Sequence, residues 1–358
     1  MNKIKLNKIF IGGLNMSGKS QLLQLLNSHP NILIYPFHKF GISYDLENFI
    51  RRFRDRKKEI RESRNYFHIY EKKINFNEYI PIESIIDYVL QSGSTGLFLL
   101  ESNFSKSCTA YAGDEHTESI KFNFDLKVFL DQIKLYQKKF SSKKISFESL
   151  ENIIFISFIK SVKEYKNFNL KKDFFLQMAA NGSQHILNLD KYFKDYKYIL
   201  IKRDLLNRLY SNVKRMLKSK KIELTKFNLY ESIIRNIENY KNYEESFNLR
   251  IRRLKISNKN IMEIEFNDLC NDKHITMLEI LKFLSLKYSS KVLEPTFIKS
   301  KLKIHKNDII NENDKIENHF KLSEVNNIKK ISKNIYFLKV YVFIFRLSNR
   351  YLHIKFTP

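Results

Sequence analysis

The apolar positions at the start of the chain predict a strand, a loop, a helix and a second strand. Residues Lys8–Gly12 form an apolar run typical of a short buried strand, and residues 21–29 repeat their leucines with a helical period. Pro30 ends this helix because proline cannot continue it, and Ile32–Tyr35 is typical of a second short strand. The pattern therefore predicts that the chain begins with a βαβ unit.

The same rhythm returns further along the chain. A strand pattern over Asp173–Ala180 is followed by a helical pattern over 183–196 and by a second strand pattern over Tyr198–Ile201. A further strand pattern over Asn260–Phe266 precedes an amphipathic helical pattern over 275–286. Strands and helices that alternate in this way build a parallel sheet covered by helices, so the pattern predicts an α/β fold.

Residues from about 45 to 165 are mostly helical in pattern. They include the basic run 51–64, which we interpret as a solvated helix face, and the segment 92–103, which is apolar enough for another strand. The segment 105–119 contains serine, threonine and glycine and is the best loop candidate. Nothing in this region predicts its function.

These patterns predict one domain and one extension. The domain covers 1–300, with a mostly helical insertion at about 41–170, and a basic, aromatic C-terminal extension covers 301–358. The segment 334–356 either packs on the domain or lies in a membrane interface; its apolar stretch, Ile335–Leu347, is shorter than the roughly 20 residues that span a bilayer. The apolar run in the first fourteen residues is too short for the core of a signal peptide, so we expect no export signal. We expect a cytoplasmic protein, with membrane association through the C-terminal segment as the alternative.

Composition adds a positive field to this picture. Hydrophobic residues make up 43% of the chain, which excludes wholesale disorder, and only 8 Gly and 5 Pro favour a helix-rich fold. The net charge of +26 attracts phosphates, sulfates, nucleic acid or anionic lipid, although a low-GC coding bias towards lysine explains it equally well. Cys108 and Cys270 lie far apart, which argues against a disulfide framework or a zinc site and fits a reducing compartment.

A phosphate-binding loop (P-loop) motif follows the first predicted strand. Residues Gly13–Ser20 satisfy GxxxxGK[ST], in which backbone N–H groups and a helix N-terminus face an anion. Lys19 can reach a phosphate or a leaving oxygen, and the Ser20 hydroxyl can bond a phosphate or hold magnesium. The alternative is a tight turn without a ligand.

A second anion site is indicated after the strand at Tyr198–Ile201. Arg203 follows that strand, and Ser211 stands eight positions later on the next predicted helix. An arginine fork and a hydroxyl placed in this way can hold a second phosphate away from the first. The alternative is a surface arginine and a helix serine that share no ligand.

These segments together resemble the sulfotransferase family. In that family a strand ends in Arg-Asp/Asn-Pro-Arg/Lys, and the Arg and a Ser eight residues later hold the 3′-phosphate of 3′-phosphoadenosine 5′-phosphosulfate (PAPS). Residues 9–32 are similar to the family's 5′-phosphosulfate loop, helix and His-Pro. Residues 262–286 resemble its later strand and helix, and 293–297 resemble a proline-containing element of some bacterial members. The middle of the chain, about 40–171, carries no resemblance.

The resemblance implies a fold, a co-substrate and ligands. The fold is a P-loop Rossmann-like three-layer α/β fold with a parallel sheet and a large helical insertion. The co-substrate is PAPS without a metal, and the acceptor is a hydroxyl group, most often of a glycan; no specific nucleic acid is implied. The implied ligands of the 5′-phosphosulfate are Met16, Ser17, Gly18, Lys19 and Ser20. Those of the 3′-phosphate are Arg203 and Ser211.

Three positions depart from the family pattern. Met16 stands where the family has a basic residue, Lys19 where it has the first threonine, and Leu205 where it has proline. A lysine at a helix start reaches back over the loop, so Lys19 is expected to replace the missing cation and to stabilise the leaving oxygen. The same residue also suits a loop that binds nucleoside triphosphates.

Sulfuryl transfer also needs a base that accepts the proton of the acceptor hydroxyl. Some family branches place this base just after the second strand, where His38 is our candidate and Lys39 a neighbouring cation. Other branches place Lys or His after the third strand, where only His185 follows, a turn later. The base therefore stays open, and a diverged or inactive member is an alternative.

Two other classes remain. An ATP- or GTP-dependent kinase or NTPase fits the complete P-loop motif and would need a magnesium-binding acid, for which Glu101 is a candidate. It leaves Arg203 and Ser211 unexplained. A basic protein that binds nucleic acid or a membrane surface fits the charge but not the P-loop.

Overall fold

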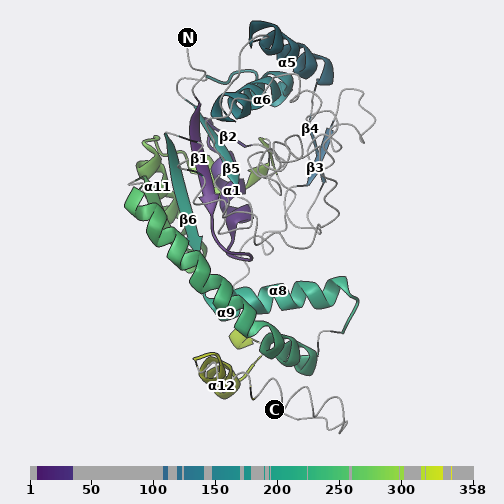
Figure 1. Ribbon diagram of the computed structural model, residues 1–358, viewed down its shortest axis with the longest axis vertical. Coiled ribbons are helices and arrows are strands. Elements are labelled where there is room, and N and C mark those ends of the chain that lie inside the picture. Colours follow the sequence, from purple (N-terminus) through teal and green to yellow (C-terminus); the bar gives the residue numbers. More distant parts are fainter. Residues whose placement is uncertain are drawn as a thin grey trace, which may run out of the picture.

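A computed structural model gives the arrangement of the chain in space (Figure 1). The structure describes the following residues: 6–34, 108–111, 119–122, 125–140, 147–169, 173–178, 189, 193, 195–223, 225–257, 260–297, 299–301, 316–318, 320–333 and 340.

A five-stranded parallel sheet forms the centre of the described fold, with the order β2-β5-β1-β6-β7. The central strand β1 pairs with β5 on one side and β6 on the other, with Ile11 opposite both Met178 and Ile199. This parallel α/β arrangement is the predicted fold class. Its strands are β1 (Asn7–Gly12), β2 (Ile32–Ile34), β5 (Phe174–Met178), β6 (Tyr196–Lys202) and β7 (Ile261–Glu265).

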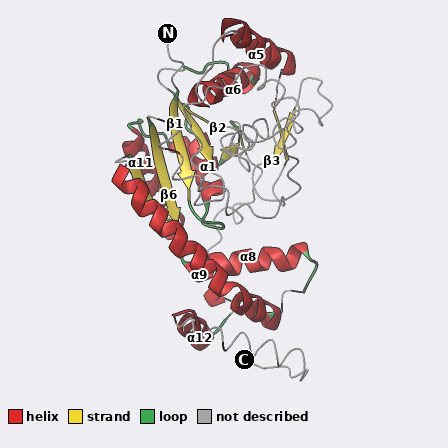
Figure 2. Cartoon of the chain, in the orientation of Figure 1, coloured by secondary structure: helices red, strands yellow, loops and turns green. Residues whose placement is uncertain are grey.

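Helices surround this sheet and extend beyond it (Figure 2). None of the described helices is both long enough and apolar enough to span a bilayer. The α-helices are α1 (Lys19–Asn27), α5 (Leu126–Phe140), α6 (Phe147–Ser161), α8 (Leu205–Ser219), α9 (Lys226–Ser257), α10 (Phe266–Asn271), α11 (Lys273–Leu284) and α12 (Leu322–Lys333). Short 3-10 helices cover Lys163–Tyr165, Ser290–Leu293 and Ile316–Asn318.

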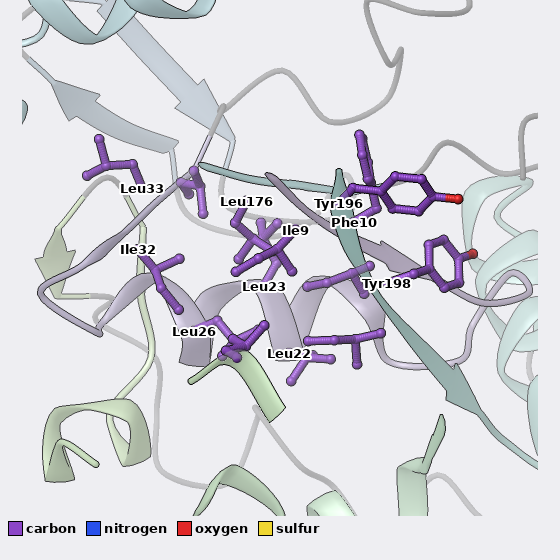
Figure 3. Close-up of a cluster of buried hydrophobic side chains, with 14 of the residues drawn as sticks. Ile9, Phe10, Leu22, Leu23, Leu26, Ile32, Leu33, Leu176, Tyr196 and Tyr198 are labelled. Atoms are coloured by element: carbon purple, nitrogen blue, oxygen red, sulfur yellow. The ribbon is translucent and has the colours of Figure 1, made fainter. Parts of the chain in front are cut away.

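Both faces of β1 are buried, as a three-layer fold requires. Ile9 is fully buried and Phe10 is 3% exposed, and successive strand residues point to opposite faces of a sheet. The Phe10 ring lies 5.1 Å from the Phe193 ring and 5.6 Å from the Tyr196 ring. The leucines of α1 pack beside Ile9 in the same core (Figure 3).

A second, smaller core joins the C-terminal extension to α8 and α9. Phe320, Val325 and Ile328 pack with buried leucines and isoleucines of α8 and of the first part of α9. α8, α12 and the first part of α9 lie beyond the end of the sheet (Figure 2). The later part of α9 contributes to the main core, so this one helix connects the two cores.

The loop expected over 105–119 is wrong in part. Cys108–Tyr111 forms strand β3 and pairs antiparallel with β4 (Ser119–Phe122). This hairpin lies within the insertion predicted at about 41–170, so the described part of that insertion contains strands as well as the α-helices α5 and α6. Serine and threonine at these positions obscured the strand, because a short strand needs little hydrophobic alternation when its pairing is local.

Lys299 fastens the end of α1 to the start of β2. Its ammonium group donates to the main-chain oxygens of Asn27, His29 and Ile32, at 2.7, 2.5 and 2.6 Å. Lys299→Met removes three N–H donors from carbonyl groups of buried residues, so we expect the free energy of unfolding to fall by about 2–4 kcal/mol. Urea unfolding measures this, with exposed Lys291→Met as the control. Equal losses in the two variants would contradict the assignment.

His29 makes the fold sensitive to acid. Burial lowers the pKa of His29 below its ordinary value, and its Nδ1 accepts from the Asn31 N–H at 3.1 Å. Below about pH 6.5, His29 is therefore protonated to a greater extent in the unfolded chain than in the native protein. Proton binding then favours unfolding, so the free energy of unfolding falls as the pH falls. We expect His29→Gln to reduce this loss between about pH 7.5 and 5.5, and exposed His274→Gln to leave it unchanged. Urea midpoints across this range test it; a wild-type slope in His29→Gln would contradict it.

Candidate functional site

The P-loop connects β1 to α1 and has the backbone of an anion cradle. Met16 and Gly18 have φ angles of 62° and 94°, and Gly18 is the residue before the first turn of α1. A Cβ atom on Gly18 would lie 2.3 Å from the Phe266 ring, so both its backbone angle and its packing require glycine. The loop thus directs main-chain N–H groups and a helix N-terminus to one place, which suits a phosphate or sulfate group.

Lys19 reaches back over this loop, as its position at the helix start predicts. Its Nζ atom donates to the main-chain oxygens of Gly13 and Leu14, at 2.6 and 2.9 Å, and the residue is 6% exposed. The contacts hold a positive charge beside the loop, where little water screens it. Ser20, the second residue of α1, is half-buried.

Arg203 meets the P-loop at the same edge of the sheet. Its Nη1 donates to the main-chain oxygen of Met16 at 3.1 Å, and its guanidinium carbon lies 4.6 Å from the centre of the Phe266 ring. This contact follows from the register of parallel strands, because Gly12 of β1 lies opposite Leu200 of β6. The carboxyl ends of two adjacent parallel strands therefore place the P-loop and Arg203 together, at the edge where α/β proteins bind ligands.

Two of the predicted ligand residues carry a buried hydroxyl group that has no hydrogen-bond partner within the described part of the chain. The Ser17 hydroxyl belongs to the P-loop, in a residue that is 2% exposed, and the Ser211 hydroxyl belongs to α8, in a residue that is 8% exposed. A buried hydroxyl is normally paired, and an unpaired one costs about 1–3 kcal/mol. Both are available to the oxygens of a phosphate ligand.

The structure brings together only part of the predicted site. The P-loop, Lys19 and Arg203 are in contact, and Ser211 lies on the helix that follows Arg203. The proposed base His38 and its neighbour Lys39 lie outside the described residues, as do His185 and Glu101.

Two residues of this site were not anticipated from the sequence. Phe266 stands at the end of β7, packs against Gly18 and faces the Arg203 guanidinium. Arg208 donates from Nε to the main-chain oxygen of Arg203 at 3.0 Å. The sequence does offer a signal for Phe266, because an aromatic residue directly after a strand can pack beside a ligand site at that edge of the sheet. It offers none for Arg208, because a charged residue on an amphipathic helix is expected to be exposed.

One comparison with known proteins identifies a family. A family model described as "Sulfotransferase family" matches residues 8–290. No curated protein matches the chain.

Several solved structures are similar at low identity. The sulfotransferase domain of the Synechococcus PCC 7002 olefin synthase is 11% identical, with a TM-score of 0.41, over 92% of this chain and 96% of that chain. A sulfotransferase from Alicyclobacillus acidocaldarius is 10% identical, with a TM-score of 0.40, over 95% and 96% of the two chains. A sulfotransferase from Mycobacterium tuberculosis H37Rv is 13% identical, with a TM-score of 0.39, over 81% and 70%.

Proposed function

Since this chain belongs to the PAPS-dependent sulfotransferase family, we propose that it transfers the sulfuryl group of PAPS to a hydroxyl group of a carbohydrate. The contact between the Arg203 guanidinium and the P-loop residue Met16 carries the proposal. PAPS has phosphate groups at the 3′ and 5′ positions of its ribose, and this edge of the sheet offers a P-loop for the 5′ group and an arginine for the 3′ group. The carbohydrate acceptor rests on the resemblance of the sequence alone.

The proposed ligands fit two separate phosphate groups. The N-terminus of α1, the positive φ angles of Met16 and Gly18 and the unpaired Ser17 hydroxyl suit the 5′-phosphosulfate. Arg203 and the unpaired Ser211 hydroxyl suit the 3′-phosphate.

Sulfuryl transfer requires two things of the protein: stabilisation of the charge on the leaving oxygen and removal of the proton from the acceptor hydroxyl. The acceptor oxygen attacks the sulfur atom while the bond from sulfur to the phosphate oxygen breaks, so negative charge grows on that phosphate oxygen. Lys19 would stabilise this charge from its place beside the loop. His38 would accept the proton from the acceptor hydroxyl, which leaves adenosine 3′,5′-bisphosphate and the sulfated acceptor as products.

Calorimetric titration with adenosine 3′,5′-bisphosphate, beside ATP with magnesium, tests the donor site. We expect the bisphosphate to bind and to raise the melting temperature, because a ligand of the native state stabilises it by mass action. Binding of magnesium-ATP without binding of the bisphosphate would refute the sulfotransferase assignment of this site and favour a kinase or NTPase.

A further inference from the structure

Arg208 is the largest side chain that is completely buried in the described part of the fold. It lies in the first turns of α8 and is 1% exposed. Its Nη2 donates to Oε1 of Glu244 on α9 at 2.7 Å, and its Nε donates to the main-chain oxygen of Arg203 at 3.0 Å. One buried guanidinium thus connects the middle of the long helix α9 to the residue that follows β6.

This ion pair joins a buried guanidinium to a partly exposed carboxylate, since the side chains of Arg208 and Glu244 are 1% and 28% exposed. An ion pair that is largely removed from water is a poor way to stabilise a fold. Burial lowers the pKa of Arg208 and raises the pKa of Glu244, while the attraction between the two charges opposes both shifts. Removing two charges from water costs free energy that their attraction only partly returns, so apolar side chains of similar volume are often equally stabilising. The pair at this position points to a task other than stability.

That task concerns the main chain of Arg203. The Arg203 carbonyl accepts from Arg208, and the next residue, Asp204, accepts through its side chain from the N–H groups of Leu206 and Asn207, at 2.9 and 3.1 Å. These hydrogen bonds fix the chain on the C-terminal side of the Cα atom from which the Arg203 guanidinium reaches the P-loop, and the pairing of Lys202 with Glu265 of β7 fixes it on the other side.

We propose that Arg208 and Glu244 are a positioning pair for the 3′-phosphate site, and that they hold the Arg203 main chain so that its guanidinium stays beside the P-loop. This inference rests on the proposed function. Neither residue touches the ligand; both act through Arg203. α9 packs into both cores, and Glu244 is one of its residues. The pair therefore makes the geometry of the 3′-phosphate site depend on the position of α9 relative to the sheet.

Two variants separate positioning from stability. Arg208→Lys keeps the positive charge beside Glu244, but an ammonium group lacks the guanidinium fork that bonds two acceptors in fixed directions. The double variant Arg208→Met, Glu244→Leu replaces the pair with apolar side chains and is expected to keep the urea midpoint of the wild type. We expect both to bind adenosine 3′,5′-bisphosphate about tenfold more weakly, because misplaced binding groups lose much of their effect.

Glu324→Ala is the matched control. It removes the ion pair between Glu324 and Lys226, 2.6 Å in length, which joins α12 to the first residue of α9. Bisphosphate binding should equal that of the wild type.

The possible outcomes distinguish a failure of the proposed positioning pair from a failure of the proposed donor site. Wild-type affinity in Arg208→Lys, or in a double variant that keeps the wild-type urea midpoint, would overturn the positioning pair and leave the donor site intact. Failure of the wild type itself to bind the bisphosphate would overturn the proposed function, and the pair with it. Weak binding in Arg208→Lys with an unchanged urea midpoint would support the proposal, whether or not the double variant folds.

Discussion

Arg203→Ala is expected to weaken the binding of adenosine 3′,5′-bisphosphate by about 100-fold or more. Loss of one partner of a desolvated charged contact costs about 2–5 kcal/mol, and 1.4 kcal/mol corresponds to a factor of ten. Arg203 is half-buried, donates to the main chain of Met16 and lies beside the Phe266 ring, and alanine can make neither contact. Isothermal calorimetry at fixed ionic strength measures the loss.

Two variants control for charge and for folding. Lys202→Met removes the same charge one residue earlier, from a side chain that is 40% exposed and pairs with Glu263, and should change the affinity less than threefold. Arg203→Lys keeps the charge without the fork and should bind with intermediate affinity. Similar losses in Arg203→Ala and Lys202→Met would indicate a general field rather than a site.

The sheet strands could be predicted because each is a short apolar run with a clear end. Gly12 and Gly13 end β1, Pro30 separates α1 from β2, and a charged pair follows β6. These signals are local, so the five strands and the α/β class are confirmed, with ends that shift by at most two residues.

The order of the strands in the sheet could not be predicted from local patterns. Pairing of β1 with β5 joins residues that are more than 160 positions apart, and no local pattern encodes it. The same holds for the three carbonyl groups that Lys299 contacts and for the contact between Arg208 and Glu244. Charged residues are expected on the surface, and only long-range packing determines which of them are buried.

The candidate site shows the same division. The P-loop could be read from its motif and from the strand and helix beside it, and the return of Lys19 over the loop follows from helix geometry. That Arg203 touches the same loop depends on the parallel register of β1 and β6. The choice of His38 as the base has no such support and stays a prediction.

Lys19→Thr is expected to slow sulfuryl transfer by about 100- to 1,000-fold, the loss typical when one group that stabilises growing charge is removed. Threonine is the residue that the family pattern has at this position. The affinity for adenosine 3′,5′-bisphosphate should fall as well, because the 5′-phosphate of this product keeps the negative charge that grows on the leaving oxygen. Turnover of PAPS with an acceptor found by screening, beside calorimetry, separates the two effects.

Moving the cation tests the role of Lys19 most directly. The double variant Met16→Lys, Lys19→Thr restores the basic residue at the family's usual position, three residues earlier on the same loop. Met16 has a φ angle of 62°, and lysine, unbranched like methionine, adopts this angle at similar cost. If the charge beside the loop is what the reaction needs, the double variant should recover most of the turnover that Lys19→Thr loses. If turnover stays low while the double variant folds and binds the bisphosphate, Lys19 acts by holding the carbonyl groups of Gly13 and Leu14 in place, and its proposed action on the leaving oxygen is wrong.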